Sequence, residues 1–103
     1  MKKIIDGKMY NTETAEVIAK ADSNGVYARG DFHWQEETLY KKKTGEYFLY
    51  GEGGPMTKYA EPDGNGARWG EKIIPLTVDD AKRFVEENCS TETYIELFGE
   101  PEE

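Results

Sequence analysis

The stretch EETLYKKKTGEYFLYGEGG, residues 36–54, decides the fold of this chain. Strand-forming residues occupy positions 38–40 and 47–50, and Lys43-Thr44-Gly45 lies between these two runs. Aromatic and β-branched residues favour strands, and a glycine between two such runs favours a tight reversal of the chain. The stretch therefore predicts a β-hairpin, the strongest in the sequence.

Further strands are expected on both sides of this hairpin. The dipeptide Asp6-Gly7 favours a two-residue turn between two short strands, because both residues tolerate a positive φ. A turn or brief helical cap at residues 11–15 and an extended segment at residues 16–22 follow, and then a loop at residues 23–31.

Residues 52–71 are rich in glycine and poor in apolar side chains, and they predict a long surface connection anchored by Trp69. The segment EKIIPLT, residues 71–77, then predicts a last strand. Its Pro75 is suited to an edge strand or a strand end, because proline has no N–H to donate to a neighbour.

Two helices are expected at residues 77–98. Thr77 and Asp80 form a capping-box pattern, Ser90 is a second N-cap, and Gly99 is a C-terminal stop. The apolar residues of the first helix recur at helical spacing and are Val78, Ala81, Phe84 and Val85, and those of the second are Tyr94, Ile95 and Phe98. Residues 99–103 are expected to fray.

These elements predict an α+β fold: a small antiparallel β-sheet with two C-terminal helices packed on one face. With 103 residues, the chain is long enough for one domain, residues 1–103, with residues 1–76 mainly β. The residues expected to supply most of its core are Leu39, Tyr47, Leu49, Ile73, Ile74, Phe84, Val85, Ile95 and Phe98.

The composition narrows the classes of function. A net charge of −8 argues against a protein that binds nucleic-acid phosphates over its whole surface, and it favours a cationic partner. With one cysteine and one histidine, the chain has almost none of the side chains that usually bind zinc. It contains no apolar run of 18 residues, so neither export nor membrane insertion is predicted. We expect a cytoplasmic protein without a cofactor.

The glycine-rich segment GEGGPMTK, residues 51–58, poses the question of a phosphate-binding loop. A P-loop requires the spacing G-x-x-x-x-G-K-[ST] before a helix, whereas here Met56 and Thr57 occupy the sixth and seventh positions. Glu52 would also place a negative charge among the phosphates. The segment is therefore interpreted as structural, with glycines that end a strand and allow an unusual backbone path.

The residues capable of catalysis do not form a recognisable set. His33 has nearby carboxylates but no partner histidine or available serine, and a surface position beside Trp34 is expected. Cys89 follows a helix and is interpreted as a partly buried, inert thiol rather than an activated one. The paired carboxylates at residues 36–37, 79–80 and 86–87 are expected to be solvated rather than to bind metal. We therefore do not expect an enzyme.

Charge is segregated along the chain. Residues 77–103 hold nine carboxylates and two cations, whereas residues 1–76 hold twelve and eleven. Such an acidic surface attracts a basic groove, although solubility alone is an alternative explanation. The candidate partner-binding residues are Asp79, Asp80, Glu86, Glu87, Glu92, Glu96 and Glu100. The one basic run, residues 41–43, is expected at the hairpin tip, where it either contacts phosphate or keeps the turn soluble.

Four segments resemble known proteins: MKKIIDGKMYNTETAEVIA, EETLYKKKTGEYFLYGEGGPMTKYA, GEKIIPLTVDDAKRF and YIELFGEPEE. They are similar to small acidic proteins of phages and conjugative elements of Firmicutes, a group that includes proteins resembling type II-A anti-CRISPRs, inhibitors of Cas9. The resemblance covers most of the chain apart from residues 22–33 and 61–70, and it matches no known contact residue.

The resemblance implies a stoichiometric inhibitor of a CRISPR nuclease, Cas9, in the cytoplasm of a bacterial host. Its partner would be Cas9 or the Cas9–guide RNA complex, without direct sequence-specific DNA binding. An interaction module of a mobile element, or an antitoxin-like regulator with a different basic host partner, is the alternative.

Overall fold

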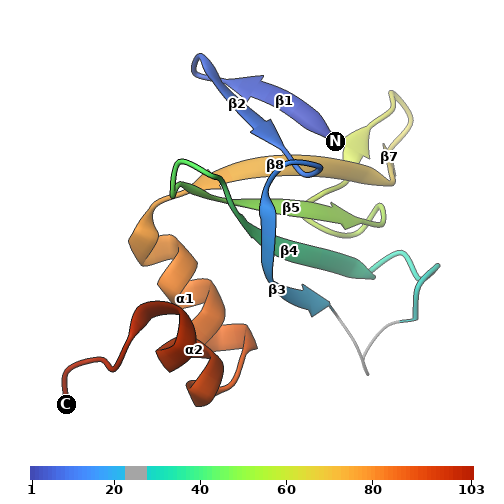
Figure 1. Ribbon diagram of the computed structural model, residues 1–103. Helices are drawn as coiled ribbons and strands as arrows, with labels where there is room; N and C mark the ends of the chain where they lie inside the picture. The colour runs from blue at the N-terminus through green and yellow to red at the C-terminus, as the bar shows by residue number, and fades with distance from the viewer. Residues whose placement is uncertain (23–27) are drawn as a thin grey trace.

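The computed structural model describes residues 1–22 and 28–103 (Figure 1), so that part of the loop expected at residues 23–31 lies outside the described residues. In chain order, the elements are β1 (Lys2–Ile5), β2 (Lys8–Asn11), β3 (Glu16–Asp22), β4 (Gln35–Lys41), β5 (Tyr47–Gly53), β6 (Glu61–Pro62), β7 (Ala67–Arg68), β8 (Gly70–Leu76), α1 (Val78–Asn88) and α2 (Thr91–Phe98).

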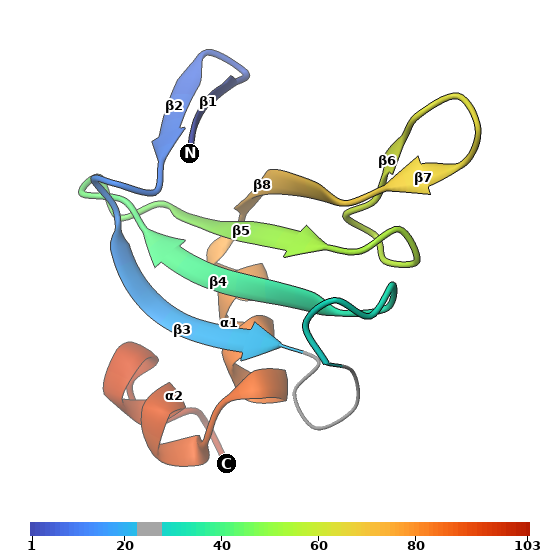
Figure 2. The ribbon, with the colours of Figure 1, turned by 90° about the vertical axis from the view of Figure 1, so that its right-hand side faces the viewer.

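The centre of the fold is a four-stranded antiparallel sheet in the order β3-β4-β5-β8 (Figure 2). The predicted β4–β5 hairpin is confirmed: Leu39 pairs with Leu49, and Gly45 takes a φ of 95° in the turn. Among the described residues, β8 pairs only with β5, so Pro75 lies near the end of an edge strand, as expected.

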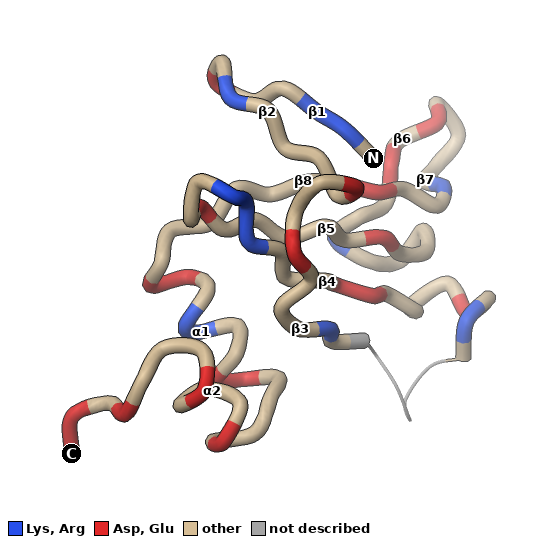
Figure 3. The backbone as a smooth tube through the Cα atoms, viewed as in Figure 1, with Lys and Arg blue, Asp and Glu red and all other residues tan. Residues whose placement is uncertain are grey.

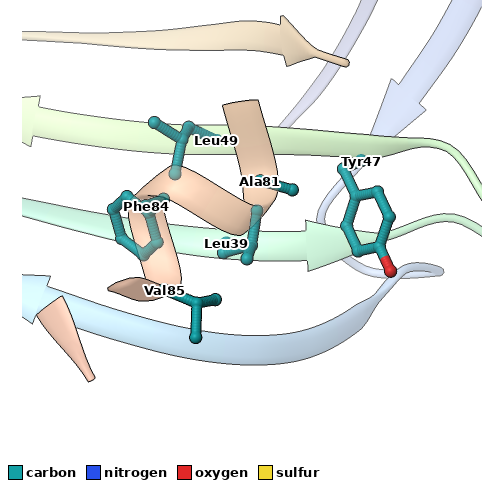
Figure 4. Close-up of a cluster of buried hydrophobic side chains, with 6 residues drawn as sticks. All are labelled: Leu39, Tyr47, Leu49, Ala81, Phe84 and Val85. Atoms are coloured by element: carbon teal, nitrogen blue, oxygen red, sulfur yellow. The ribbon is translucent and has the colours of Figure 1, made fainter. Parts of the chain in front are cut away.

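Both helices pack on one face of this sheet, which confirms the predicted α+β architecture (Figure 1). The core on this side joins side chains of β4, β5 and α1 (Figure 4): Leu39, Tyr47, Leu49, Ala81, Phe84 and Val85. Helix α2 adds Tyr94 and Phe98, whose rings lie 5.2 Å apart, and Phe98 also meets Tyr47 at 6.0 Å.

The opposite face carries a second, smaller core. The β1–β2 hairpin turns at Asp6 and Gly7, both at positive φ as predicted, and it places Tyr10 against Phe48 and Ile73. Ile73 was expected in the same core as Ile74. Because successive strand residues point to opposite faces, only Ile74 packs on the helix side.

The helix caps follow the predictions. The Thr77 hydroxyl accepts from the Asp80 N–H at 3.1 Å, and the Thr77 N–H donates back to the Asp80 carboxylate at 3.3 Å. Ser90 accepts from the Thr93 N–H, and Gly99 ends α2 with a φ of 83°.

The structure corrects one predicted core residue, Ile95, and one residue of the apolar stripe predicted for the first helix, Val78. Val78 is 52 % exposed and Ile95 is 37 % exposed. Val78 opens the first turn of α1, ahead of the part of the helix that packs on the sheet, and α2 instead directs Leu97 toward the core.

The long connection expected at residues 52–71 is a further correction. Its first two residues belong to β5, residues 61–62 and 67–68 pair as the β6–β7 hairpin, and its last two residues open β8. Tyr59, which lies between these strands, is fully buried. A ring packed on the sheet therefore orders a segment that looks like an open loop from its composition.

Candidate functional site

The acidic residues predicted to bind a partner lie on the two helices and the segment after them. Asp79, Glu86, Glu87, Glu92, Glu96 and Glu100 are exposed, while Asp80 is partly buried. The Asp80 carboxylate belongs to the capping box of α1 and lies 3.4 Å from the Arg83 guanidinium. The Asp80 carboxylate therefore stabilises the start of α1 and also contributes negative charge to the surface.

Negative charge without intervening positive charge is found toward the end of the chain. From residue 84 to residue 103 there are seven carboxylates and no lysine or arginine. On α1, by contrast, Lys82 and Arg83 lie between Asp79 and Glu86, so its solvent side carries both signs. In Figure 3 the second helix and the tail show red without blue. The strongly negative surface is thus α2, the end of α1 and residues 99–103.

A hollow of about 310 Å³ opens within this acidic surface. Its lining includes Glu86, Cys89, Tyr94 and Ile95, and Ile95 is one of the apolar residues that the fold leaves exposed. Burial raises the pKa of the Cys89 thiol, which favours the unreactive protonated form expected for it.

The basic run at residues 41–43 follows β4 into the hairpin turn. The Lys42 ammonium lies 4.3 Å from the centre of the Tyr10 ring and 3.3 Å from Glu46, and its side chain is only 15 % exposed. Lys41 and Lys43 are exposed. Lys42 thus links the β1–β2 hairpin to the sheet through its contact with Tyr10. Only Lys41 and Lys43 of this run are available to a partner.

The glycines of residues 51–54 are required for close packing. A Cβ on Gly51 would fall within the Tyr59 ring, and one on Gly54 would lie 2.5 Å from the carbonyl oxygen of Phe32. Neither glycine has a positive φ, so their small size matters here rather than backbone freedom. Residues 54–60 form turns that lead directly into β6 rather than into a helix, as expected for a structural segment.

Tyr59 is held by a polar cluster at the edge of the core. Its hydroxyl donates to Glu37 at 2.5 Å, and the Lys58 ammonium lies 2.9 Å from the same carboxylate oxygen. Burial, followed by this hydrogen bond, raises the pKa of Tyr59 above its usual value. The neutral tyrosine therefore fastens residues 54–60 to β4.

Three carboxylates form a row on the sheet face opposite the helices. Glu36 on β4 pairs with Glu52 on β5, which pairs with Glu71 on β8. Residues directly opposite each other on antiparallel strands have Cβ atoms about 4.5–5.5 Å apart. Lys20 lies 3.8 Å from Glu36, while Glu71 accepts a hydrogen bond from the Tyr50 hydroxyl at 2.5 Å.

Two tryptophans border this carboxylate row. Trp34 and Trp69 have ring centres 6.1 Å apart, and Trp69 is 42 % exposed. The Arg29 guanidinium lies 4.7 Å from the centre of the Trp34 ring and 3.8 Å from Glu52. Sequence reasoning missed this cluster. The even spacing of Glu36 from Thr38 and Tyr40 could have placed it on one strand face, but the pairing partners could not be known.

The surroundings of His33 and of the acidic side chains give no sign of a catalytic or metal site among the described residues. His33 is exposed, as expected, and its Nδ1 lies 3.1 Å from Asp31, whose pKa is lowered chiefly by the hydrogen bond from the His33 backbone N–H. Within residues 1–22 and 28–103 no three metal-binding side chains converge on one point. None of the described helices has the length and apolar character needed to cross a membrane.

Comparisons of the chain with protein-family models, curated proteins and solved structures give no match.

Proposed function

We propose that this chain is a stoichiometric inhibitor that binds a basic, nucleic-acid-binding surface of a CRISPR nuclease, Cas9. The observation that carries the proposal is the acidic surface of α2, the end of α1 and residues 99–103. Seven carboxylates lie between residues 84 and 103, a stretch without lysine or arginine, and the Lys82 ammonium of α1 lies 5.9 Å from the centre of the Phe98 ring at its border. The resemblance to anti-CRISPR proteins supplies the target.

The chemistry of the two surfaces is complementary. Cas9 holds its guide–target duplex in a positively charged channel and reads the DNA next to its target with arginines. Carboxylates on rigid helices place negative charge where phosphates would otherwise lie, and they speed the encounter with such a channel. The inhibitor would thus compete with guide RNA or target DNA for the channel, and no catalytic step is needed.

An apolar contact would slow dissociation of the complex. Exposed charge pairs contribute about 0–1 kcal/mol each, and they act mainly on association and salt dependence. Ile95 and the hollow beside it offer an apolar patch inside the acidic surface, at the kind of position where side chains that anchor complexes are found. A basic surface with a protruding apolar or aromatic side chain fits this arrangement.

The test is a comparison of two charge reversals with the same change in net charge. One variant carries Glu86→Lys, Glu92→Lys and Glu96→Lys on the acidic surface. The control carries Glu13→Lys, Glu16→Lys and Asp63→Lys, which are exposed positions outside the helices. The first variant should slow association with Cas9 about tenfold or more and weaken protection of target DNA, whereas the control should do so far less.

Both measurements are made with and without preloaded guide RNA, on variants that still unfold cooperatively. Equal losses in the two variants would show that net charge matters and the surface does not. If the unmodified protein fails to bind Cas9 in either state, the proposed target is wrong, and capture of a different basic host protein would favour the interaction-module alternative.

A further inference from the structure

The row of Glu36, Glu52 and Glu71 places three like charges opposite one another on neighbouring strands. Carboxylates that face each other directly on neighbouring strands repel, and the strength of each repulsion is comparable to that of a favourable cross-strand pair. The two outer members are compensated differently, since Glu36 has Lys20 nearby and Glu71 has only the hydrogen bond from Tyr50 among the described residues. Sites where a sequence breaks such a local rule are often functional.

Arg29 provides an example, within the chain, of a cation in contact with this face. Arg29 reaches the row from outside the sheet and places its guanidinium over Trp34 and beside Glu52. A flat cation between an aromatic ring and a carboxylate is a recurrent binding arrangement for arginine. Arg29 contacts Trp34 and Glu52 but neither Trp69 nor Glu71. Within the described residues, no lysine or arginine contacts Trp69 or forms an ion pair with Glu71.

These two residues border an open hollow. It has a volume of about 220 Å³ and is lined by Glu52, Trp69, Gly70 and Glu71. The β1–β2 hairpin packs at the Phe48 end of this sheet face, away from β6, β7 and the start of β8 (Figure 2). One tryptophan and two carboxylates thus line a hollow next to the Arg29 guanidinium.

We propose that this end of the sheet face is a docking site for an arginine side chain on an exposed segment of a basic partner protein. The incoming guanidinium would lie against Trp69 between Glu52 and Glu71, where it would relieve the repulsion within the carboxylate row. Arg29 competes with it for Glu52. The site is on the sheet face opposite the helices, and it does not depend on the partner being a nuclease.

Arginine fits this place better than lysine. Its planar guanidinium stacks on an aromatic ring and donates hydrogen bonds to two carboxylates at once, while an ammonium is a compact and more strongly hydrated charge. A higher affinity for arginine than for lysine would indicate a specific binding site. Attraction by the net negative charge alone would give both cations the same affinity.

The experiment is an NMR titration of the full chain with the peptide acetyl-GRGRG-amide and, separately, acetyl-GKGKG-amide. The two tryptophan indole N–H signals report on the site, and the Trp69→Ala variant assigns them. The arginine peptide should shift the Trp69 signal in a saturable way, with a Kd about two- to fivefold lower than that of the lysine peptide.

Two exposed arginines provide a matched pair of variants. Arg29→Gln should lower the Kd of the arginine peptide about two- to fivefold, because it frees Glu52 and the Trp34 ring. Arg83→Gln on α1 makes the same change in net charge away from the sheet face and should leave this Kd nearly unchanged. Glu71→Gln, which keeps an acceptor for Tyr50, should raise it about two- to fivefold.

Three results would overturn the proposal. The first is an equal Kd for the two peptides at the Trp69 signal, and the second is an equal effect of Arg29→Gln and Arg83→Gln. The third is a titration in which only signals of α1 and α2 shift. Failure of Cas9 to bind the chain would leave these measurements unaffected.

Discussion

Replacement of Gly51 by alanine should destabilise the fold through one specific collision. The added Cβ would fall within the Tyr59 ring, against the Cε1, Cζ and hydroxyl atoms at its far end. Tyr59 is fully buried and backed by the sheet, so the ring must leave its place rather than shift slightly.

The cost follows from what the displaced ring loses. Exposing a large side chain that was buried costs about 1.5–3 kcal/mol. Glu37, only 13 % exposed, would also lose the hydroxyl that donates to it, at a cost of about 1–3 kcal/mol. The lower chain entropy of alanine in the unfolded state offsets about 0.4–1 kcal/mol. Gly51→Ala should therefore lower the free energy of unfolding by about 3 kcal/mol, a fall in Tm of about 12–24 °C.

Chemical denaturation of four proteins tests this reasoning: the unmodified chain, Gly51→Ala, Tyr59→Leu and the double variant. Leucine ends at its Cδ atoms, so it lacks the ring atoms that the new Cβ would meet. In the Tyr59→Leu background, Gly51→Ala should cost less than about 1 kcal/mol, since the two changes act through one contact. An equal cost in both backgrounds would refute the collision, and so would a cost below about 1 kcal/mol in the unmodified chain.

Phe84→Ala should lower the free energy of unfolding by about 3–5 kcal/mol, because its side chain is buried between α1 and the sheet, while Val78→Ala on the same helix should change it by less than about 0.5 kcal/mol. Equal effects in thermal melts would contradict the observed helix orientation. Glu46 has a pKa lowered from 4.5 to about 2, chiefly by the hydrogen bond from Lys8. Its contribution to stability should be present above pH 4.5 and lost as the pH falls toward 2, and Lys8→Met should move its midpoint back toward 4.5 in a carboxyl-carbon NMR titration; an unchanged midpoint would show that Lys8 is not the cause.

The sequence by itself determined the elements whose signals are local. The glycine of a tight turn, the two strand-forming runs around it, the Thr77–Asp80 capping box and the Gly99 stop all act over a few residues. Their outcome depends on backbone sterics and short-range hydrogen bonds rather than on distant neighbours. The strand-forming runs also placed Leu39 and Leu49 in the core, and both lie on the face that the helices cover.

The sequence also identified the concentration of charge near its end, because charge can be counted without a fold. It could not show that Asp80 is shared with a helix cap, or that Ile95 stays exposed beside the acidic residues. Those facts depend on how far each helix is rotated against the sheet. Position 95 satisfies a helical repeat, but the repeat does not state which side the neighbouring layer covers.

Only the tertiary structure decided the contacts between residues far apart in the chain. Gly51 is a glycine because Tyr59 folds back onto it, and the carboxylates of Glu36, Glu52 and Glu71 become neighbours through strand register. A shift of one residue in either register would send one member of that row to the other face. Register is fixed by the packing of both sheet faces at once, so no segment of the sequence contains this information on its own.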